Sequence, residues 1–97
     1  MTLLATLQNK REQILDIAAK HGAYNVRVFG SVVRGEDTPD SDIDFLIDYD
    51  LEKITRWFPV GLIHDLRDFL GRDVDVVAAK SLHHYIKERV LSEAKLL

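Results

Sequence analysis

Gly30-Ser31 is separated by ten residues from Asp42-Ile43-Asp44, and these two short motifs decide how the chain is interpreted. The first motif ends a β-prone segment, and a Gly-Ser turn lets backbone N–H groups approach a phosphate. The second motif begins an apolar segment, and residues at i and i+2 of a strand point to the same face. Two convergent carboxylates are typical ligands of a divalent cation. Together the motifs predict metal-dependent chemistry on a nucleotide.

The composition is typical of an ordinary soluble domain. The 97 residues are 46% apolar and 30% charged, so the length fits one domain over residues 1–97. No segment approaches the roughly 18 apolar residues that span a bilayer, and the N-terminus lacks the features of a signal peptide. The chain has no cysteine, which excludes disulfides and thiolate metal sites. We therefore expect a cytoplasmic protein without a membrane partner.

The net charge of −3 bears on the choice of partner. A nucleic-acid-binding domain of this size is usually basic, because it must neutralise phosphates. This chain is mildly acidic, and part of that acidity lies in the aspartate motif, where bound magnesium would offset it. The charge argues against a domain that wraps DNA or RNA.

Apolar periodicity divides the chain into alternating helices and strands. It predicts helices over residues 2–21, 55–70 and 81–93, and strands over residues 24–29, 42–49 and 73–78. Thr2 and Ser81 are the expected N-caps, and Pro59 places the start of the second helix near Trp57. Residues 32–34 form a short helical turn, and residues 35–41 form a loop. This order predicts an α/β fold of the mixed α+β kind, with helices packed on a small mixed β-sheet.

A third aspartate lies within the valine-rich strand expected over residues 73–78. Asp75 is flanked by Val74 and Val76, and an unpaired carboxylate buried there would cost several kcal/mol. The same carboxylate is tolerable if it faces a cation. Taken alone, Asp42 and Asp44 are also explained as solvated carboxylates at a strand edge. The apolar strand that follows them, the Gly-Ser turn and Asp75 favour a metal site instead.

Three aspartates on two neighbouring strands suit a site for two magnesium ions. Magnesium prefers hard oxygen ligands and completes its shell with water and substrate phosphates. Two such ions can hold the attacking and departing oxygens of an in-line displacement. In that arrangement Asp42 and Asp44 bridge the ions. Asp75 holds the ion that activates the attacking hydroxyl, and it can accept the hydroxyl proton.

The sequence around these residues resembles the signature of the DNA-polymerase-β-like nucleotidyltransferase superfamily. The resemblance rests on residues 28–36, with Gly30-Ser31 and then Arg34-Gly35, on residues 41–47, and on the later acid. These segments are similar to the minimal nucleotidyltransferase (MNT) branch, which includes the MntA-type antitoxins that pair with HEPN-domain toxins. The similarity extends over most of the chain and implies a polymerase-β palm-like nucleotidyltransferase fold.

The resemblance also implies roles for individual residues. Gly30 and Ser31 would bind the phosphates of ATP, while two Mg²⁺ ions and catalysis would depend on Asp42, Asp44 and Asp75. Arg34 lies where a cation could reach the triphosphate, although a solvated loop arginine explains it equally well. The implied reaction transfers AMP from ATP to an acceptor hydroxyl and releases pyrophosphate. Antitoxins of this kind, in type VII toxin–antitoxin systems, are thought to modify a tyrosine of the HEPN toxin.

Several alternatives stay open. The chain could be a non-catalytic binding antitoxin, or a nucleotidyltransferase that acts on a small molecule or an RNA 3′ end. The acidic charge disfavours RNA, and a chain this short has no residues for a second, acceptor-binding domain. We therefore expect the acceptor to bring its own surface, as a protein would, in a homo- or hetero-oligomer of unspecified state. Trp57 is expected to pack in the core, with a partner-facing anchor as the alternative.

Overall fold

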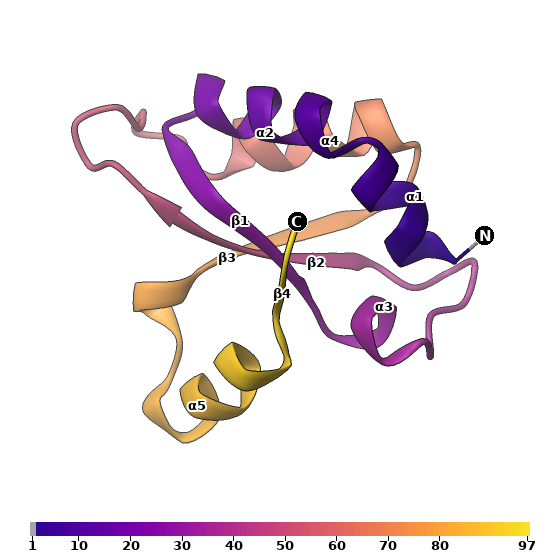
Figure 1. Ribbon diagram of the computed structural model, residues 1–97. Coiled ribbons are helices and arrows are strands. Elements are labelled where there is room, and N and C mark those ends of the chain that lie inside the picture. Colours follow the sequence, from indigo (N-terminus) through magenta and orange to yellow (C-terminus); the bar gives the residue numbers. More distant parts are fainter. Residues whose placement is uncertain (1) are drawn as a thin grey trace.

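The strands form a small mixed sheet, as the sequence predicts, with one strand more than expected. The computed structural model describes residues 2–97, and its sheet has the order β3-β2-β1-β4 (Figure 1). The strands are β1 (Ala23–Phe29), β2 (Ile43–Tyr49), β3 (Val74–Ala78) and β4 (Lys95–Leu96). β2 is parallel to β3 and antiparallel to β1, and β1 is antiparallel to β4. β2 and β1 are therefore the inner strands of the sheet.

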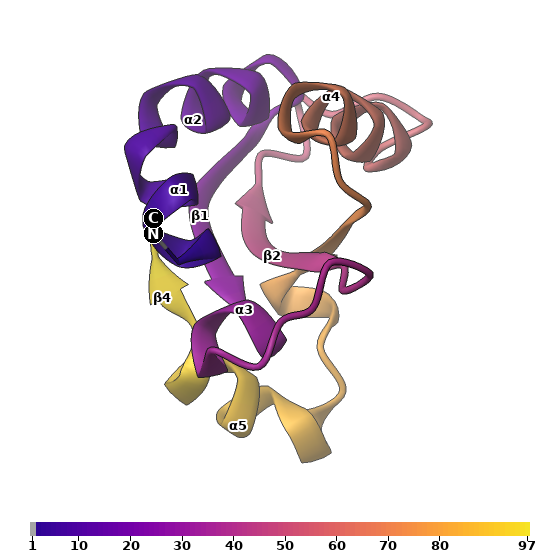
Figure 2. The ribbon, with the colours of Figure 1, turned by 90° about the vertical axis from the view of Figure 1, so that its right-hand side faces the viewer.

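The helices lie on both faces of this sheet. They are α1 (Leu3–Asn9), α2 (Arg11–Lys20), α3 (Ser31–Arg34), α4 (Val60–Leu70) and α5 (His84–Glu93), with a 3-10 turn, η1, over Ala79–Ser81. Helices α1, α2 and α4 cover one face, and α5 lies on the opposite side of the sheet (Figures 1 and 2). No helix within residues 2–97 is both long enough and apolar enough to cross a bilayer.

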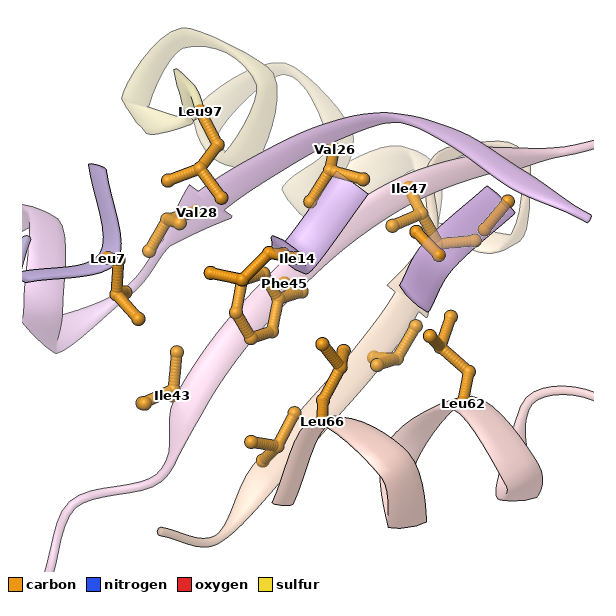
Figure 3. Close-up of a cluster of buried hydrophobic side chains, with 14 of the residues drawn as sticks. Leu7, Ile14, Val26, Val28, Ile43, Phe45, Ile47, Leu62, Leu66 and Leu97 are labelled. Carbon is orange, nitrogen blue, oxygen red and sulfur yellow. The ribbon is translucent and has the colours of Figure 1, made fainter. Parts of the chain in front are cut away.

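The core lies between β2 and the covering helices. Ile43, Phe45 and Ile47 of β2 are buried on the face that meets the helices. Figure 3 shows these side chains beside Ile14 of α2 and Leu66 of α4. Since successive side chains of a strand point to opposite faces, the even-numbered residues of β2 lie on the face away from α2 and α4. That second face carries the aspartates considered below.

The first helix is interrupted, contrary to the single helix expected over residues 2–21. α1 ends at Asn9, and α2 begins at Arg11 after Lys10, whose N–H still donates to carbonyls of α1. Every residue between Leu7 and Ile14 is polar. No apolar side chain there can hold a continuous helix against the sheet. Instead, Leu7 and Ile14 are buried separately, one from each helix.

The other two helices begin later than the sequence predicts. α4 begins at Val60 instead of Trp57, since Pro59 stands at its N-cap and the preceding residues form a turn closed by Val60 N–H to the Trp57 carbonyl at 2.8 Å. Trp57 is 74% exposed, so the expected core packing is wrong. α5 begins at His84 instead of following Ser81, which ends η1. The imidazole of His83 provides the cap by accepting from the backbone N–H of Tyr85 at 3.3 Å.

The short strand β4 was not expected from the sequence. It follows α5 directly and pairs with Arg27 and Val28 of β1. Leu97 continues the pairing by donating its N–H to the Val26 carbonyl at 3.1 Å, and its side chain is buried. A two-residue strand shows no period-2 pattern, which is why the hydrophobic pattern could not reveal it. Its position ties the end of α5 to the sheet.

Candidate functional site

The three aspartates meet at one end of the paired strands β2 and β3. Asp44 and Asp75 are register partners on these parallel strands, and Asp42 immediately precedes β2. Burial of Asp44 raises the pKa of its carboxyl group, and the negative charges of Asp75 and Asp42 raise it further. Asp42 and Asp75 are exposed, whereas Asp44 is partly buried. The structure therefore brings the three carboxylates into one repulsive cluster on the face of the sheet away from α2 and α4.

The Gly30 turn lies against this cluster. β1 ends at Phe29, whose register partner on β2 is Asp44. Gly30 follows with φ 79° and ψ −151°, a backbone conformation that side-chain-bearing residues rarely adopt. A Cβ atom on Gly30 would collide with the Oδ2 atom of Asp44 and would lie 3.3 Å from its Cγ atom. Glycine is thus required twice at this position, once by the backbone angle and once by the close approach.

Ser31 and Arg34 are placed by the short helix α3, which begins directly after Gly30. Ser31 is its first residue, and its carbonyl accepts from the backbone N–H of Glu36 at 2.9 Å. Arg34 is its last residue, and its guanidinium is close enough to Asp44 to lower the pKa of that carboxyl group. Arg34 therefore provides positive charge beside the aspartate cluster.

Glu93 joins the site from the far end of the chain. Its carboxylate accepts from Arg34 Nη1 at 2.6 Å and from the Gly30 backbone N–H at 3.2 Å. The hydrogen bond from Arg34 is the main reason that the pKa of Glu93 lies below its ordinary value, and the Gly30 N–H lowers it further. No local sequence feature marks Glu93, because the contact depends on how α5 docks against the Gly30 turn. The sequence alone therefore does not predict a role for Glu93.

A small pocket of about 230 Å³ opens between α5 and the Gly30 turn. Its walls come from the turn and α3 on one side and from α5 on the other: Phe29, Gly30, Arg34, Ile86, Arg89, Val90 and Glu93. Two of these residues are arginines, and the charge of Arg89 also lowers the pKa of Glu93. The pocket combines apolar walls with positive charge, which suits an anionic group carried on an organic molecule.

The loop that leads into Asp42 is held by an arginine. The Nη2 atom of Arg72, which lies between α4 and β3, donates to the carbonyl of Thr38 at 2.7 Å and to that of Ser41 at 2.8 Å. The hydroxyl of Ser41 also accepts from the backbone N–H of Thr38 at 2.8 Å. These bonds fix the path of the chain just before the aspartate motif. Arg72 is thus a positioning residue for Asp42, and sequence analysis did not identify it.

The aspartate cluster fits magnesium by its chemistry more than by its present geometry. The available donors are carboxylate oxygens, which magnesium prefers, and the repulsion that raises the pKa of Asp44 is the kind that a bound cation relieves. Within residues 2–97, however, no three metal-ligating side chains converge closely enough to form a ready metal site. The residues that would hold magnesium are Asp42, Asp44 and Asp75.

Known proteins match this chain over most of its length. Residues 10–97 match the family described as nucleotidyltransferase domain. A relative from Methanocaldococcus jannaschii, named as a protein adenylyltransferase, is 37% identical over 84 residues, which cover 87% of this chain and 89% of the relative. The protein adenylyltransferase MntA of Thermococcus cleftensis is 35% identical over 79 residues, which cover 80% of this chain and 78% of that protein.

Solved structures agree with these relatives. A structure described as a minimal nucleotidyltransferase is 43% identical to this chain, with a TM-score of 0.83. The match covers 100% of this chain and 97% of that chain. A chain from a toxin–antitoxin crystal structure with AMP-PNP has a TM-score of 0.72 at 24% identity, over 92% of this chain and 70% of that chain. At that identity the second likeness shows a common fold.

Proposed function

The chain belongs to the nucleotidyltransferase domain family, and from this membership we propose that it transfers AMP from ATP to a tyrosine hydroxyl of a HEPN-domain toxin. In this proposal the chain is the antitoxin of a type VII toxin–antitoxin pair, and the reaction requires Mg²⁺. The observation that carries the proposal is the contact of the Gly30 turn with Asp44, which brings that turn and three carboxylates to one place.

The residues divide the work of the reaction between them. Gly30 and Ser31 bind the phosphates through the turn, and Arg34 adds positive charge to the triphosphate. Asp42, Asp44 and Asp75 would hold Mg²⁺, which supplies charge neutralisation on the phosphates when it is bound. The Asp75 carboxylate, exposed at the edge of the cluster, accepts the proton of the acceptor hydroxyl.

The bonds that change are those at the α-phosphorus of ATP. The acceptor oxygen forms a new P–O bond there, and the bond from the α-phosphorus to the bridging oxygen of the β-phosphate breaks. Pyrophosphate leaves with the electron pair of that bond. The product is a phosphodiester that joins AMP to the acceptor. Since charge accumulates on the phosphate oxygens, Arg34 and the backbone N–H groups of the Gly30 turn act by electrostatic stabilisation and positioning.

The choice of acceptor is supported by the relatives. Two of them, at 37% and 35% identity, are named as adenylyltransferases that modify proteins. A toxin–antitoxin structure with AMP-PNP shares the fold. On the surface of the chain, Trp57 and Tyr85 are 74% and 81% exposed, and such aromatic side chains are common anchors in protein interfaces. These features favour a protein acceptor over a small molecule or an RNA end.

The test is label transfer to a purified HEPN toxin partner. With α-labelled ATP and Mg²⁺, the chain is expected to label the toxin, and Asp42→Asn combined with Asp44→Asn is expected to reduce the rate at least about 100-fold. Asp16→Asn, an exposed aspartate on α2, is the matched control and keeps the wild-type rate. Absence of labelling by the wild type would contradict the proposal. Neutralisation of the toxin by the double variant would favour the non-catalytic binding antitoxin.

A further inference from the structure

Glu93 accepts hydrogen bonds from two donors, Gly30 N–H and Arg34 Nη1, that in the proposed function bind the phosphates of the nucleotide. Its Oε2 atom accepts from the Gly30 N–H at 3.2 Å, and its Oε1 atom accepts from Arg34 Nη1 at 2.6 Å. We propose that Glu93 occupies the phosphate-binding position of the Gly30 turn and is displaced when a nucleotide polyphosphate binds. This inference rests on the proposed function, because it concerns the phosphate-binding residues of the same site.

The chemistry of the contact resembles that of a bound phosphate. A carboxylate is planar and a phosphate is tetrahedral, but both present anionic oxygens. Both accept charge-assisted hydrogen bonds from backbone N–H groups and from arginine. The hydrogen bond from Gly30 cannot be shared at full strength between Glu93 and a phosphate oxygen. The Glu93 charge also acts on Asp44, where it raises the pKa of that carboxyl group. A polyphosphate entering beside Glu93 would meet an anion already in its place.

The pocket between α5 and the Gly30 turn provides the space for this exchange. Arg89 lines the same pocket as Arg34 and Glu93, so a polyphosphate that displaces Glu93 finds two arginines there. Arg34 loses one anionic partner and gains another, so the exchange leaves the number of its hydrogen bonds nearly unchanged. The nucleotide affinity is then the intrinsic affinity reduced by the population in which Glu93 holds the site.

The movement is expected at the side chain of Glu93 and not at the backbone of α5. Glu93 is the last residue of the helix, and β4 follows it at once and pairs with β1. Leu97 anchors the same segment, since its side chain is buried and its carbonyl accepts from Arg11 Nε at 2.6 Å. The Glu93 side chain remains 20% exposed, so it has solvent into which it can turn.

The experiment measures the affinity for α,β-methylene ATP with Mg²⁺, a pair that cannot transfer AMP. Glu93→Gln keeps the size of the side chain but removes its charge, and it is expected to lower the Kd about three- to tenfold. Glu88→Gln is the matched control, because Glu88 is exposed on the same helix and lines a different groove. The control is expected to leave the Kd unchanged. A merely structural role of Glu93 would predict weaker binding in Glu93→Gln.

A second measurement needs no variant. In the wild-type chain, the side-chain carboxyl carbon resonance of Glu93 is expected to move when the analogue binds, since the carboxylate loses its Arg34 partner. Two outcomes would overturn the inference while leaving the proposed function intact. In the first, the wild type binds the analogue but the Glu93 resonance does not change. In the second, the wild type binds and a folded Glu93→Gln has a Kd equal to or higher than that of the wild type. If the wild type and both variants fail to bind the analogue, the proposed function fails and the inference fails with it.

Discussion

Asp44 and Asp75 are register partners on the parallel strands β2 and β3, and the pKa of Asp44 is raised first by burial and then by the negative charge of Asp75. Like charges on facing positions of two strands destabilise a sheet. The chain retains this arrangement next to a glycine turn that only glycine can form. The cluster therefore costs stability in the metal-free protein, in a place where the proposed reaction requires negative charge.

The first prediction concerns the stability of the metal-free chain. Asp44 has a pKa above that of an unfolded aspartate, so its contribution to stability is present at low pH and is lost as the pH rises through the folded-state pKa. Asp44→Asn is therefore expected to raise the Tm at pH 7 by about 2–6 °C without Mg²⁺. The gain should disappear near pH 3. Thermal melts across this range test it, and Asp16→Asn should show no such gain; a lower Tm for Asp44→Asn at pH 7 would contradict it.

The second prediction separates backbone strain from collision at the Gly30 turn. Gly30 and Gly35 both have positive φ, at 79° and 72°, but only a Cβ on Gly30 would meet Asp44. Gly35→Ala should cost about 1 kcal/mol from its left-handed backbone angles, and Gly30→Ala should cost more, because its ψ of −151° lies outside the left-handed region. Only Gly30→Ala is expected to lose nucleotide affinity and label transfer, by about tenfold or more. Urea unfolding and transfer assays on both variants decide the point, and equal loss of transfer would refute the close-approach argument.

The third prediction concerns the loop before Asp42. Arg72 donates hydrogen bonds to the carbonyls of Thr38 and Ser41, and removal of both bonds should make the position of Asp42 less well defined. Arg72→Gln is expected to lower kcat about 3- to 30-fold with a smaller change in the KM for ATP. Arg67→Gln, which lines the same 530 Å³ depression, is the control and should keep the wild-type kcat. A change confined to KM would mean that Arg72 binds nucleotide directly.

The fourth prediction concerns the core beneath β2. Leu62 of α4 is fully buried against the sheet, whereas Leu51 in the loop after β2 is 71% exposed. Leu62→Ala is expected to reduce the free energy of unfolding by about 2–5 kcal/mol, because it leaves a cavity in packed surroundings. Leu51→Ala should change it by less than about 0.5 kcal/mol. Chemical denaturation measures both, and similar losses for the two variants would mean that α4 is not the cover of this core.

The elements that the sequence predicts well are those that depend on local pattern. The run of apolar residues after Asp44 identifies an inner strand, and the alternation around Val26 identifies its neighbour. The aspartate motif and the Gly30 turn are also local, and the structure brings them together. The sequence argument for Asp75 assumes a carboxylate buried among valines, and that premise is wrong, because Asp75 is exposed. Asp75 joins the cluster through its register pairing with Asp44.

The parts that the sequence does not predict depend on contacts between distant segments. Glu93 and Gly30 are 63 residues apart, and nothing near Glu93 distinguishes it from Glu88 on the same helix. The break at Lys10 depends on which apolar side chains the sheet buries, Leu7 from α1 and Ile14 from α2. The helical periodicity of the sequence does not contain that information. Trp57 was assigned to the core by its residue type, but it lies in the turn before Pro59, outside the helix face that meets the sheet.

The pairing of β4 with β1 has a consequence for how the chain is synthesised. Arg11 and Leu97 are joined by a hydrogen bond although they are 86 residues apart, and the same segment covers the outer edge of β1. On the ribosome, β1 emerges before residues 95–97, so its outer edge stays open until those residues have been synthesised. Contacts of such long range form late in folding, and an open edge invites pairing with another nascent chain. In the folded chain, residues 95–97 cover this edge through their pairing with β1.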